Sequence, residues 1–445
     1  MFRTFPKGGV HPPEYKISAD KKIKTLDVPE QVVVLLNQNL GAPSKALVNK
    51  KDKVKVGQKI AEAGGFVSSN IHSPVSGTVL KIDNIIDTSG YKKSAIVINV
   101  EGDEWEESID KSDEIKTEIN LSSEEIIDKI KEMGIVGMGG ATFPTHVKLS
   151  IPKGNTCEYL IINGVECEPF LTSDHRLMLE KGEELIVGVR ILMKALKVEK
   201  AYIGIERNKP DAIEYLSELC QNTTEDIEVV PLKVKYPQGG EKQLIKAITK
   251  REVPSGGLPI HVGVVVQNVG TTLAVYEAVQ KNKPLIDRIV TVTGDKVENS
   301  GNFLVRIGTS IDKLIEAVGG IPEDTGKIIN GGPMMGKAMK ISNVPVTKGT
   351  SGIVLLSESK SHREEIMPCI KCSRCVNVCP QGLEPYLLMD ISKKKMWEEA
   401  EKQNNLDCIE CGSCSFICPS NRPLLDYIRY GKQNVTALRR SRVKK

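Results

Sequence analysis

The sequence lacks three features that would place a protein in a common class at once. Its 445 residues carry a net charge of only +4, so bulk charge gives no reason to expect a nucleic-acid partner. No run of 18 or more apolar residues occurs, so we expect no membrane-spanning helix. Residues 1–15 contain glycine and proline but no apolar stretch, so we expect no signal peptide.

Cysteine is also scarce outside one repeated motif. Of the 11 cysteines, only Cys157, Cys167 and Cys220 lie elsewhere, which is not a secreted disulfide framework and indicates a reducing compartment. The remaining composition, 40% hydrophobic and 27% charged, is that of an ordinary globular protein able to bury several cores. The length predicts about three domains.

The repeated motif is the most informative feature of the chain. Each copy reads C-x2-C-x2-C-x3-C-P, the spacing of ferredoxins that hold two [4Fe–4S] clusters, with the fourth cysteine bound to the other cluster. The predicted ligand sets are Cys369, Cys372, Cys375 and Cys418 for one cluster, and Cys408, Cys411, Cys414 and Cys379 for the other. Two all-thiolate zinc sites are the alternative. Three cysteines at successive gaps of two, found twice, favour iron–sulfur clusters.

The N-terminal part predicts a small β domain over residues 26–101, after an arm formed by residues 1–25. Short apolar runs at 32–36, 46–48, 77–82 and 94–100 alternate with glycine and proline turns, which is typical of strands without helices. The sequence of residues 54–61 and 71–79 resembles a lipoyl-type barrel-sandwich domain. The tip of its hairpin, residues 68–72, has no lysine, so we expect the scaffold without a swinging arm.

An acidic linker, 102–120, precedes an α/β domain expected over residues 121–285. Ser122 and Glu125 form a capping box, which predicts a helix start. Buried-type strands at 159–162, 201–205, 227–234 and 262–267 alternate with helical patterns at 183–196, 210–220, 242–249 and 271–281. Such alternation predicts a parallel, Rossmann-like sheet.

Four further segments complete the predicted multidomain α/β and α+β architecture. Residues 286–356 indicate a small β-grasp-like unit, with strands at 288–293, 303–307 and 327–329 and a helix at 310–318. A polar linker, 357–365, leads to a helical two-cluster module at 366–430. Residues 431–445 are a basic tail, which we expect to be frayed and solvated, with contact to an acidic partner or lipid as the alternative.

A glycine-rich loop at residues 134–145 follows the capped helix. Dense glycine permits close approach of the backbone to a flat or phosphorylated ligand, and Lys148 adds charge for a phosphate. Asn163 and Asn268 each follow a predicted strand, and ligands of parallel sheets bind at the carboxyl ends of strands. Gly240 opens a helix, which favours an anion. The sequence therefore predicts a ligand at this edge.

These segments resemble the flavin- and NADH-binding subunit of respiratory complex I. The resemblance implies FMN, bound without a covalent link, and NAD(H) over it, with Phe143 stacking on nicotinamide and Glu168 reading the adenosine side. The cofactor-binding residues so implied are Gly137, Gly139, Gly140, Phe143, Lys148, Asn163, Glu166, Glu168, Gly240, Glu241 and Asn268. Met138, Val165 and Lys242 depart from that family, so more residues of this chain match the flavin-binding part of the site than the NADH-binding part.

The order of all these segments, together with the opening stretch at residues 5–14, resembles the C subunit of Rnf-type ion-translocating ferredoxin:NAD oxidoreductases. That resemblance implies a peripheral electron-transfer subunit on the cytoplasmic face of the cell membrane. Its partners would be other members of the complex, including an iron–sulfur subunit, and ferredoxin indirectly, with Na+ or H+ moved by other subunits. A cobalamin reductase of a diol-utilisation microcompartment and a non-enzymatic iron–sulfur adaptor are the alternatives.

Overall fold

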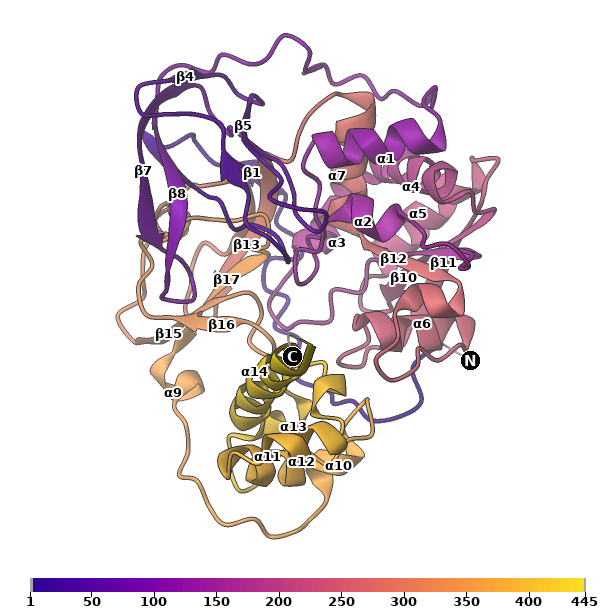
Figure 1. Ribbon diagram of the computed structural model, residues 1–445, viewed down its shortest axis with the longest axis vertical. Helices are drawn as coiled ribbons and strands as arrows, with labels where there is room; N and C mark the ends of the chain where they lie inside the picture. The colour runs from indigo at the N-terminus through magenta and orange to yellow at the C-terminus, as the bar shows by residue number, and fades with distance from the viewer. Residues whose placement is uncertain (1–2, 444–445) are drawn as a thin grey trace.

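A computed structural model describes residues 3–443 (Figure 1). The barrel-sandwich domain lies beside the α/β domain, a mixed-sheet domain lies below the barrel, and the cysteine-rich helices form the lower end of the molecule. In the part of the chain that the structure describes, no helix combines the length and the apolar character needed to cross a bilayer.

The N-terminal β domain consists of two small sheets, and residues 26–101 contain no helix, as predicted. The strand order is β2-β8-β7-β4 in one sheet and β3-β5-β6 in the other. Alternate residues such as Val32, Val34, Ile96 and Ile98 are fully buried, so the two sheets share one core. The strands are β2 (Gln31–Leu35), β3 (Lys45–Ala46), β4 (Lys53–Val54), β5 (Lys59–Glu62), β6 (Ile71–His72), β7 (Gly77–Ile86) and β8 (Lys92–Val100).

The hairpin tip of this domain is buried at a junction of three domains. Ser69 and Asn70 are 3% and 8% exposed. The buried Lys348 donates from Nζ to the carbonyl oxygens of Asn70 (2.9 Å) and Gly134 (2.7 Å). Residues 69 and 70 are thus fixed against the segment that leads into the glycine loop.

The α/β domain has the predicted parallel sheet, in the order β11-β10-β9-β12. Alternation along β9 decides which face each residue covers: Leu160 and Ile162 pack under α1, α4, α5 and α7, whereas Ile161 packs on the α6 side. The strands are β9 (Tyr159–Asn163), β10 (Lys200–Glu206), β11 (Asp226–Leu232) and β12 (Val264–Asn268). The helices are α1 (Ser123–Glu132), α2 (Thr145–Leu149), α3 (Ser173–Glu180), α4 (Gly182–Leu196), α5 (Pro210–Gln221), α6 (Glu241–Thr249), α7 (Val269–Gln280) and the 3-10 turn Pro259–Val262.

The third domain is a sheet of order β1-β14-β13-β17-β15-β16. Its predicted elements are present as β13 (Asp287–Gly294), β14 (Gly301–Arg306), α8 (Ile311–Glu316) and β15 (Thr325–Asn330). Three strands were not predicted: β1 (Ile23–Thr25), β16 (Lys337–Met339) and β17 (Gly352–Ser357). The linker prediction for 357–365 is wrong at its start, because β17 ends at Ser357 and α9 (Glu358–Ser361) follows directly.

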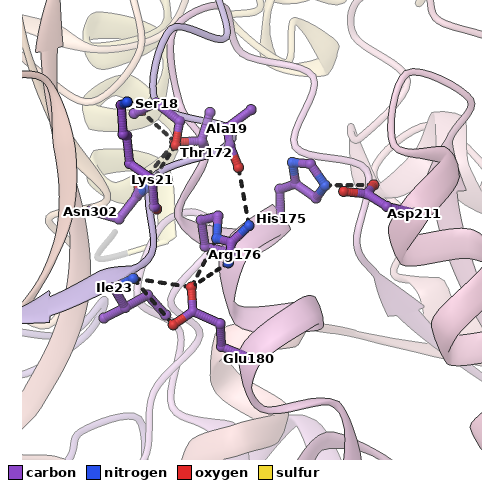
Figure 2. A network of polar contacts seen from close by, with 10 residues as sticks. All are labelled: Ser18, Ala19, Lys21, Ile23, Thr172, His175, Arg176, Glu180, Asp211 and Asn302. Carbon is purple, nitrogen blue, oxygen red and sulfur yellow. Dashed lines mark hydrogen bonds and ion pairs between the residues drawn. The ribbon is translucent and has the colours of Figure 1, made fainter.

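The N-terminal arm is bound between two domains rather than free (Figure 2). Asn302 of β14 donates to the carbonyl oxygens of Ser18 (3.1 Å) and Lys21 (3.2 Å). Glu180 of α3 accepts from the Ile23 amide (3.0 Å) and from Arg176 Nε (2.8 Å). These contacts bring β1 into parallel register with β14, a pairing that no local pattern encodes.

The cysteine module is helical, as predicted, but its last helix is longer than expected. It comprises α10 (Arg374–Asn377), α11 (Pro385–Lys393), α12 (Trp397–Lys402), the 3-10 turn Asn405–Asp407, α13 (Ser413–Phe416) and α14 (Leu424–Val443). The frayed-tail prediction is wrong for residues 431–443, because Val435 is fully buried against α11 and α12 and Arg439 pairs with Glu401. Lys444 and Lys445 lie outside the described residues, as do Met1 and Phe2 of the arm.

Candidate functional site

The glycine loop lies against the carboxyl end of β12. The Met138 amide donates to Thr271 Oγ1 at the start of α7 (2.9 Å), and the Gly137 amide donates to the Phe143 carbonyl (2.9 Å). A Cβ atom on Gly139 would lie 2.9 Å from Asn268 Nδ2, whereas one on Gly140 would meet nothing within 4 Å. Glycine at 139 is therefore required by packing, while Gly140 presents bare backbone to open space.

Two asparagines end neighbouring strands at this edge, as the sequence predicts. Asn163, the last residue of β9, donates to the Gly239 carbonyl (2.8 Å). Asn268 caps α7 by accepting from the Gly270 amide (2.8 Å) and donates to Asp174 (2.7 Å). Burial, and after it the neighbouring Glu166, raise the pKa of Asp174 well above its usual value, against the lowering effect of Asn268.

The predicted phosphate lysine reaches the same edge from α2. Lys148 Nζ donates to the Val266 carbonyl and to Glu241 Oε1, both at 2.6 Å. Glu241 is the first residue of α6, and Gly240 is its N-cap. The amide dipoles of a helix N-terminus and a lysine charge both favour an anion here, and the Glu241 carboxylate fixes the lysine by an ion pair.

Two of the three predicted glutamates, Glu166 and Glu168, bind backbone amides of the protein itself. Glu166 caps α3 by accepting from the amides of Asp174 (2.7 Å) and His175 (3.2 Å). Glu168 accepts from the amides of Met334 (3.0 Å) and Met335 (2.9 Å), so it would have to exchange these partners to bind a ribose. Phe143 is half-buried on the glycine loop. The predicted NADH contacts of Phe143 and Glu168 remain predictions.

The cysteines of the two runs differ in burial: three are buried, Cys369 and Cys372 are exposed, and the other three are intermediate. Burial raises the pKa of Cys408 to about 12, with smaller raising effects from the thiols of Cys411 and Cys379 that oppose the lowering effects of the Glu410 amide and Lys432. Cys379 likewise raises the pKa of Cys414, after burial and the two other second-run thiols. Cys379 thus lies among the cysteines of the second run. Cys418 interacts in the same way with Cys375, while Cys369 and Cys372 are exposed.

The spacing of the two cysteine runs is the feature that favours a cubane. The four thiolates of a [4Fe–4S] cubane bind four different irons and therefore lie farther apart than the ligands of one zinc. The two C-x2-C-x2-C-x3-C-P runs fit the cubane requirement.

Two residues near the site carry no sequence signal. Lys16 of the N-terminal arm donates from Nζ to the carbonyl oxygens of Glu166 (2.8 Å), Glu168 (2.9 Å) and Leu171 (2.6 Å), which fixes the turn after β9. Tyr236 is 2% exposed and donates from its hydroxyl to the Cys411 carbonyl (2.8 Å). Both contacts join segments more than 100 residues apart.

Four family models match the chain. They are the Nuo51 FMN-binding domain over residues 130–277, the RnfC barrel sandwich hybrid domain over 4–103, the SLBB domain over 289–338 and the 4Fe-4S dicluster domain over 363–419. An NAD+-reducing [NiFe]-hydrogenase crystal structure shares the fold, with a TM-score of 0.50 and 18% identity over 71% of this chain and 62% of its own.

Two curated relatives match over nearly their whole length, and both are the C subunits of ion-translocating complexes. That of the proton-translocating ferredoxin:NAD(+) oxidoreductase complex of Clostridium ljungdahlii is 46% identical over 100% of this chain and 97% of its own. That of the Na(+)-translocating ferredoxin:NAD(+) oxidoreductase complex of Acetobacterium woodii is 44% identical over 98% of each chain.

An FMN-binding fold joined in one chain to a two-cluster module defines a flavin and iron–sulfur electron-transfer protein. Within that class, the chain belongs to the RnfC family, the C subunits of the Rnf-type ferredoxin:NAD oxidoreductase complexes.

Proposed function

We propose that this chain passes electrons between NAD(H), FMN and two [4Fe–4S] clusters as the C subunit of a membrane-bound, ion-translocating ferredoxin:NAD oxidoreductase. The observation that carries the proposal is the union of the FMN-binding domain and the dicluster domain in a chain that matches named C subunits end to end. The relatives' names give H+ in one case and Na+ in another, so the coupling ion varies within the family.

The residues at the carboxyl edge of the parallel sheet fit FMN. Lys148 and the N-terminus of α6 supply positive charge for a phosphate, and Gly137, Gly139 and Gly140 allow a flat ligand to approach the backbone. Asn163, Asn268 and Glu241 line the same edge, and Glu166 holds the turn after β9 in place. When bound, FMN supplies the conversion between two-electron nicotinamide chemistry and one-electron cluster chemistry.

The eight motif cysteines would hold the clusters in the crossed arrangement predicted from their spacing. The mutual effects of Cys379, Cys408, Cys411 and Cys414 support one set, and those of Cys375 and Cys418 support the other. NAD(H) is selected over NADP(H) by Glu168, whose carboxylate repels a 2′-phosphate. Glu168→Gln should therefore relax the preference against NADPH.

Other subunits of the complex supply the ion path and the further electron carriers. The ion path lies in other subunits, an iron–sulfur subunit accepts or donates electrons at the cysteine module, and ferredoxin is reached indirectly. The chain sits on the cytoplasmic face of the membrane as a peripheral subunit.

Anaerobic purification followed by metal, flavin and reduction analysis tests this function. We expect about eight iron atoms per chain from two cubanes, one non-covalent FMN, and bleaching of the flavin by NADH. Stoichiometric zinc without visible absorbance would refute the cluster assignment. Intact clusters without flavin would favour the non-enzymatic adaptor.

A further inference from the structure

The cysteine module contacts the FMN-binding domain and the N-terminal arm at ligands of the second predicted cluster. Tyr236, in the turn before α6, donates to the carbonyl oxygen of Cys411 (2.8 Å). The same hydroxyl lies 3.2 Å from Oε1 of Glu168, on the turn that follows β9. One buried side chain therefore touches both the flavin-side turn and a second-run cysteine.

The opening stretch of the chain contacts another ligand of that cluster. The Gly9 amide donates to the Val378 carbonyl (2.8 Å). Gly8 has φ +73°, and a Cβ there would lie 2.6 Å from the carbonyl carbon of Cys379. Only glycine combines that backbone angle with so close an approach. The arm thus lies directly on the cysteine that crosses from the first run to the second cluster.

These two contacts form one structural unit. Val10 and Tyr236 exchange backbone hydrogen bonds, with N–O distances of 2.8 and 2.9 Å. Val10, Tyr236 and Cys411 share a buried apolar cluster in which Val378 and Ile417 also pack. We call residues 7–10 together with Tyr236 the arm joint.

The first-run cysteines have the opposite setting. Cys369 and Cys372 are exposed, and Ile370 between them is 67% exposed. By contrast, Cys379 and Cys411 are only 9% and 7% exposed. The two predicted clusters therefore differ in position: one is enclosed against the FMN-binding domain, and the other faces outward.

We propose that the arm joint positions the second-run cluster, held by Cys408, Cys411, Cys414 and Cys379, against the flavin-side turn. The second-run cluster then exchanges electrons with the flavin. The first-run cluster exchanges electrons with a redox partner outside this chain. Gly8 and Tyr236 are positioning residues. The inference deepens the proposed function and rests on it. Hydrogen bonds and solvent exposure around a cluster set its potential, so the Tyr236 hydroxyl tunes the second-run cluster alone.

Redox titration monitored by electron paramagnetic resonance tests the joint on the full, reconstituted chain. The two signals are first assigned with Cys372→Ser and Cys414→Ser, one from each run. Tyr236→Phe removes a donor beside the second-run cluster, so its potential should become more negative while that of the first-run cluster stays unchanged. Tyr202→Phe on β10 is the control for loss of a tyrosine hydroxyl.

Gly8→Ala tests the arm by opening the joint. With iron and flavin contents unchanged, flavin-to-cluster electron transfer in stopped flow should slow by tenfold or more. Gly90→Ala is the matched control, because Gly90 has φ +81° but a Cβ there meets nothing within 4 Å. A shift confined to the first-run cluster, or unaltered potentials and rates in both joint variants, would overturn the inference. Wild-type protein without flavin or clusters would instead refute the proposed function itself.

Discussion

At the scale of single residues, Lys148 shows how charge is prepared for a ligand. Its ammonium group is fixed by the Val266 carbonyl and by the Glu241 carboxylate before any phosphate arrives. Such pairing lowers the entropy lost on binding, because the lysine is already ordered. It also means that removing the lysine would leave the Glu241 carboxylate facing the phosphate alone.

Lys148→Ala should therefore weaken FMN binding strongly. Loss of a charged hydrogen bond costs about 1.5–3 kcal/mol, which corresponds to about tenfold or more in Kd. Flavin titration of the apoprotein measures this. Lys242→Ala is the matched control, because Lys242 follows Glu241 on α6 but donates to the Pro254 carbonyl. Equal flavin affinity of the Lys148 variant and wild type would contradict the phosphate assignment.

Glu168 makes folding stability depend on pH. Burial raises its pKa from 4.5 to about 7, although the amides of Met334 and Met335 oppose this rise. The folded state therefore binds the proton more tightly than the unfolded state. The contribution of Glu168 to the free energy of unfolding is full below pH 4.5 and is lost as the pH rises through 7. The free energy of unfolding changes by at most about 1.4 kcal/mol per pH unit because of this group.

Glu168→Gln should remove this contribution. As the pH is raised from about 5.5 to 7.5, the window set by the raised pKa, wild type loses the stabilisation by Glu168 and the variant does not. The thermal midpoint of the variant should therefore fall less, or rise more, than that of wild type over this range. Glu124→Gln, at an exposed ion pair with Lys197, serves as the control and should follow wild type. Parallel pH profiles of wild type and the Glu168 variant would show that this carboxyl is not protonated in the folded protein.

At the scale of elements, the two cysteine runs are built in the same way around one short helix each. The first two cysteines precede a short helix, α10 or α13, the third lies within it, and the fourth follows it before proline. Since Cys379 lies among the second-run thiols, Cys379→Ser should damage the second-run cluster and spare most of the first-run signal. Electron paramagnetic resonance with iron analysis measures the loss. Cys157→Ser, outside both runs, is the control, and damage confined to the first-run cluster would exclude crossed ligation.

Sequence patterns predict elements well where local periodicity coincides with burial. The four parallel strands and the capped helix α1 are predicted within a few residues, because each strand is an apolar run between turns. β17 escapes prediction although its six residues are all buried, since the run follows closely on glycines and a polar segment. β1 and the end of α14 depend on partners far along the chain, namely β14 and the α11–α12 pair.

The same distinction applies to the candidate site. Glycine, lysine and asparagine at strand ends are predictable because the carboxyl edge of a parallel sheet gathers them. Lys16, Tyr236 and Lys348 are not, because each acts on a carbonyl oxygen in a distant segment. Every residue has a backbone carbonyl, so the sequence does not indicate which of them accepts such a hydrogen bond. Only the folded structure reveals these contacts.

At the scale of the whole molecule, the N-terminal arm connects parts that are far apart in sequence. It pairs with β14, contacts the turn after β9 through Lys16, and lies on the cysteine module at Gly8 and Gly9. The arm, the buried hairpin tip and Lys348 together fix the four domains around the carboxyl edge of the parallel sheet. This rigidity suits a chain whose cofactors must keep fixed distances.

Membrane association is the property that separates the proposed function from the cobalamin-reductase alternative. In the proposed complex, partner subunits and surface charge attach this chain to the membrane. The basic end of α14 supplies less free charge than its composition suggests, because Arg439 and Arg442 pair with Glu401. Ile366 and Ile370 are 60% and 67% exposed on the first-run face, where the proposed function expects contact with another iron–sulfur subunit.

With the whole complex co-expressed, the chain should pellet with membranes and be released by high salt or a chaotrope without detergent, because salt screens exposed charges. Ile370→Asp should shift it to the soluble fraction, since a carboxylate would be desolvated in that contact. Tyr91→Asp is the control, at a residue that is 71% exposed on the barrel-sandwich domain. Immunoblots of the membrane and soluble fractions measure the distribution. Full recovery of wild type in the soluble fraction at low salt would reject the membrane complex and favour the cobalamin reductase.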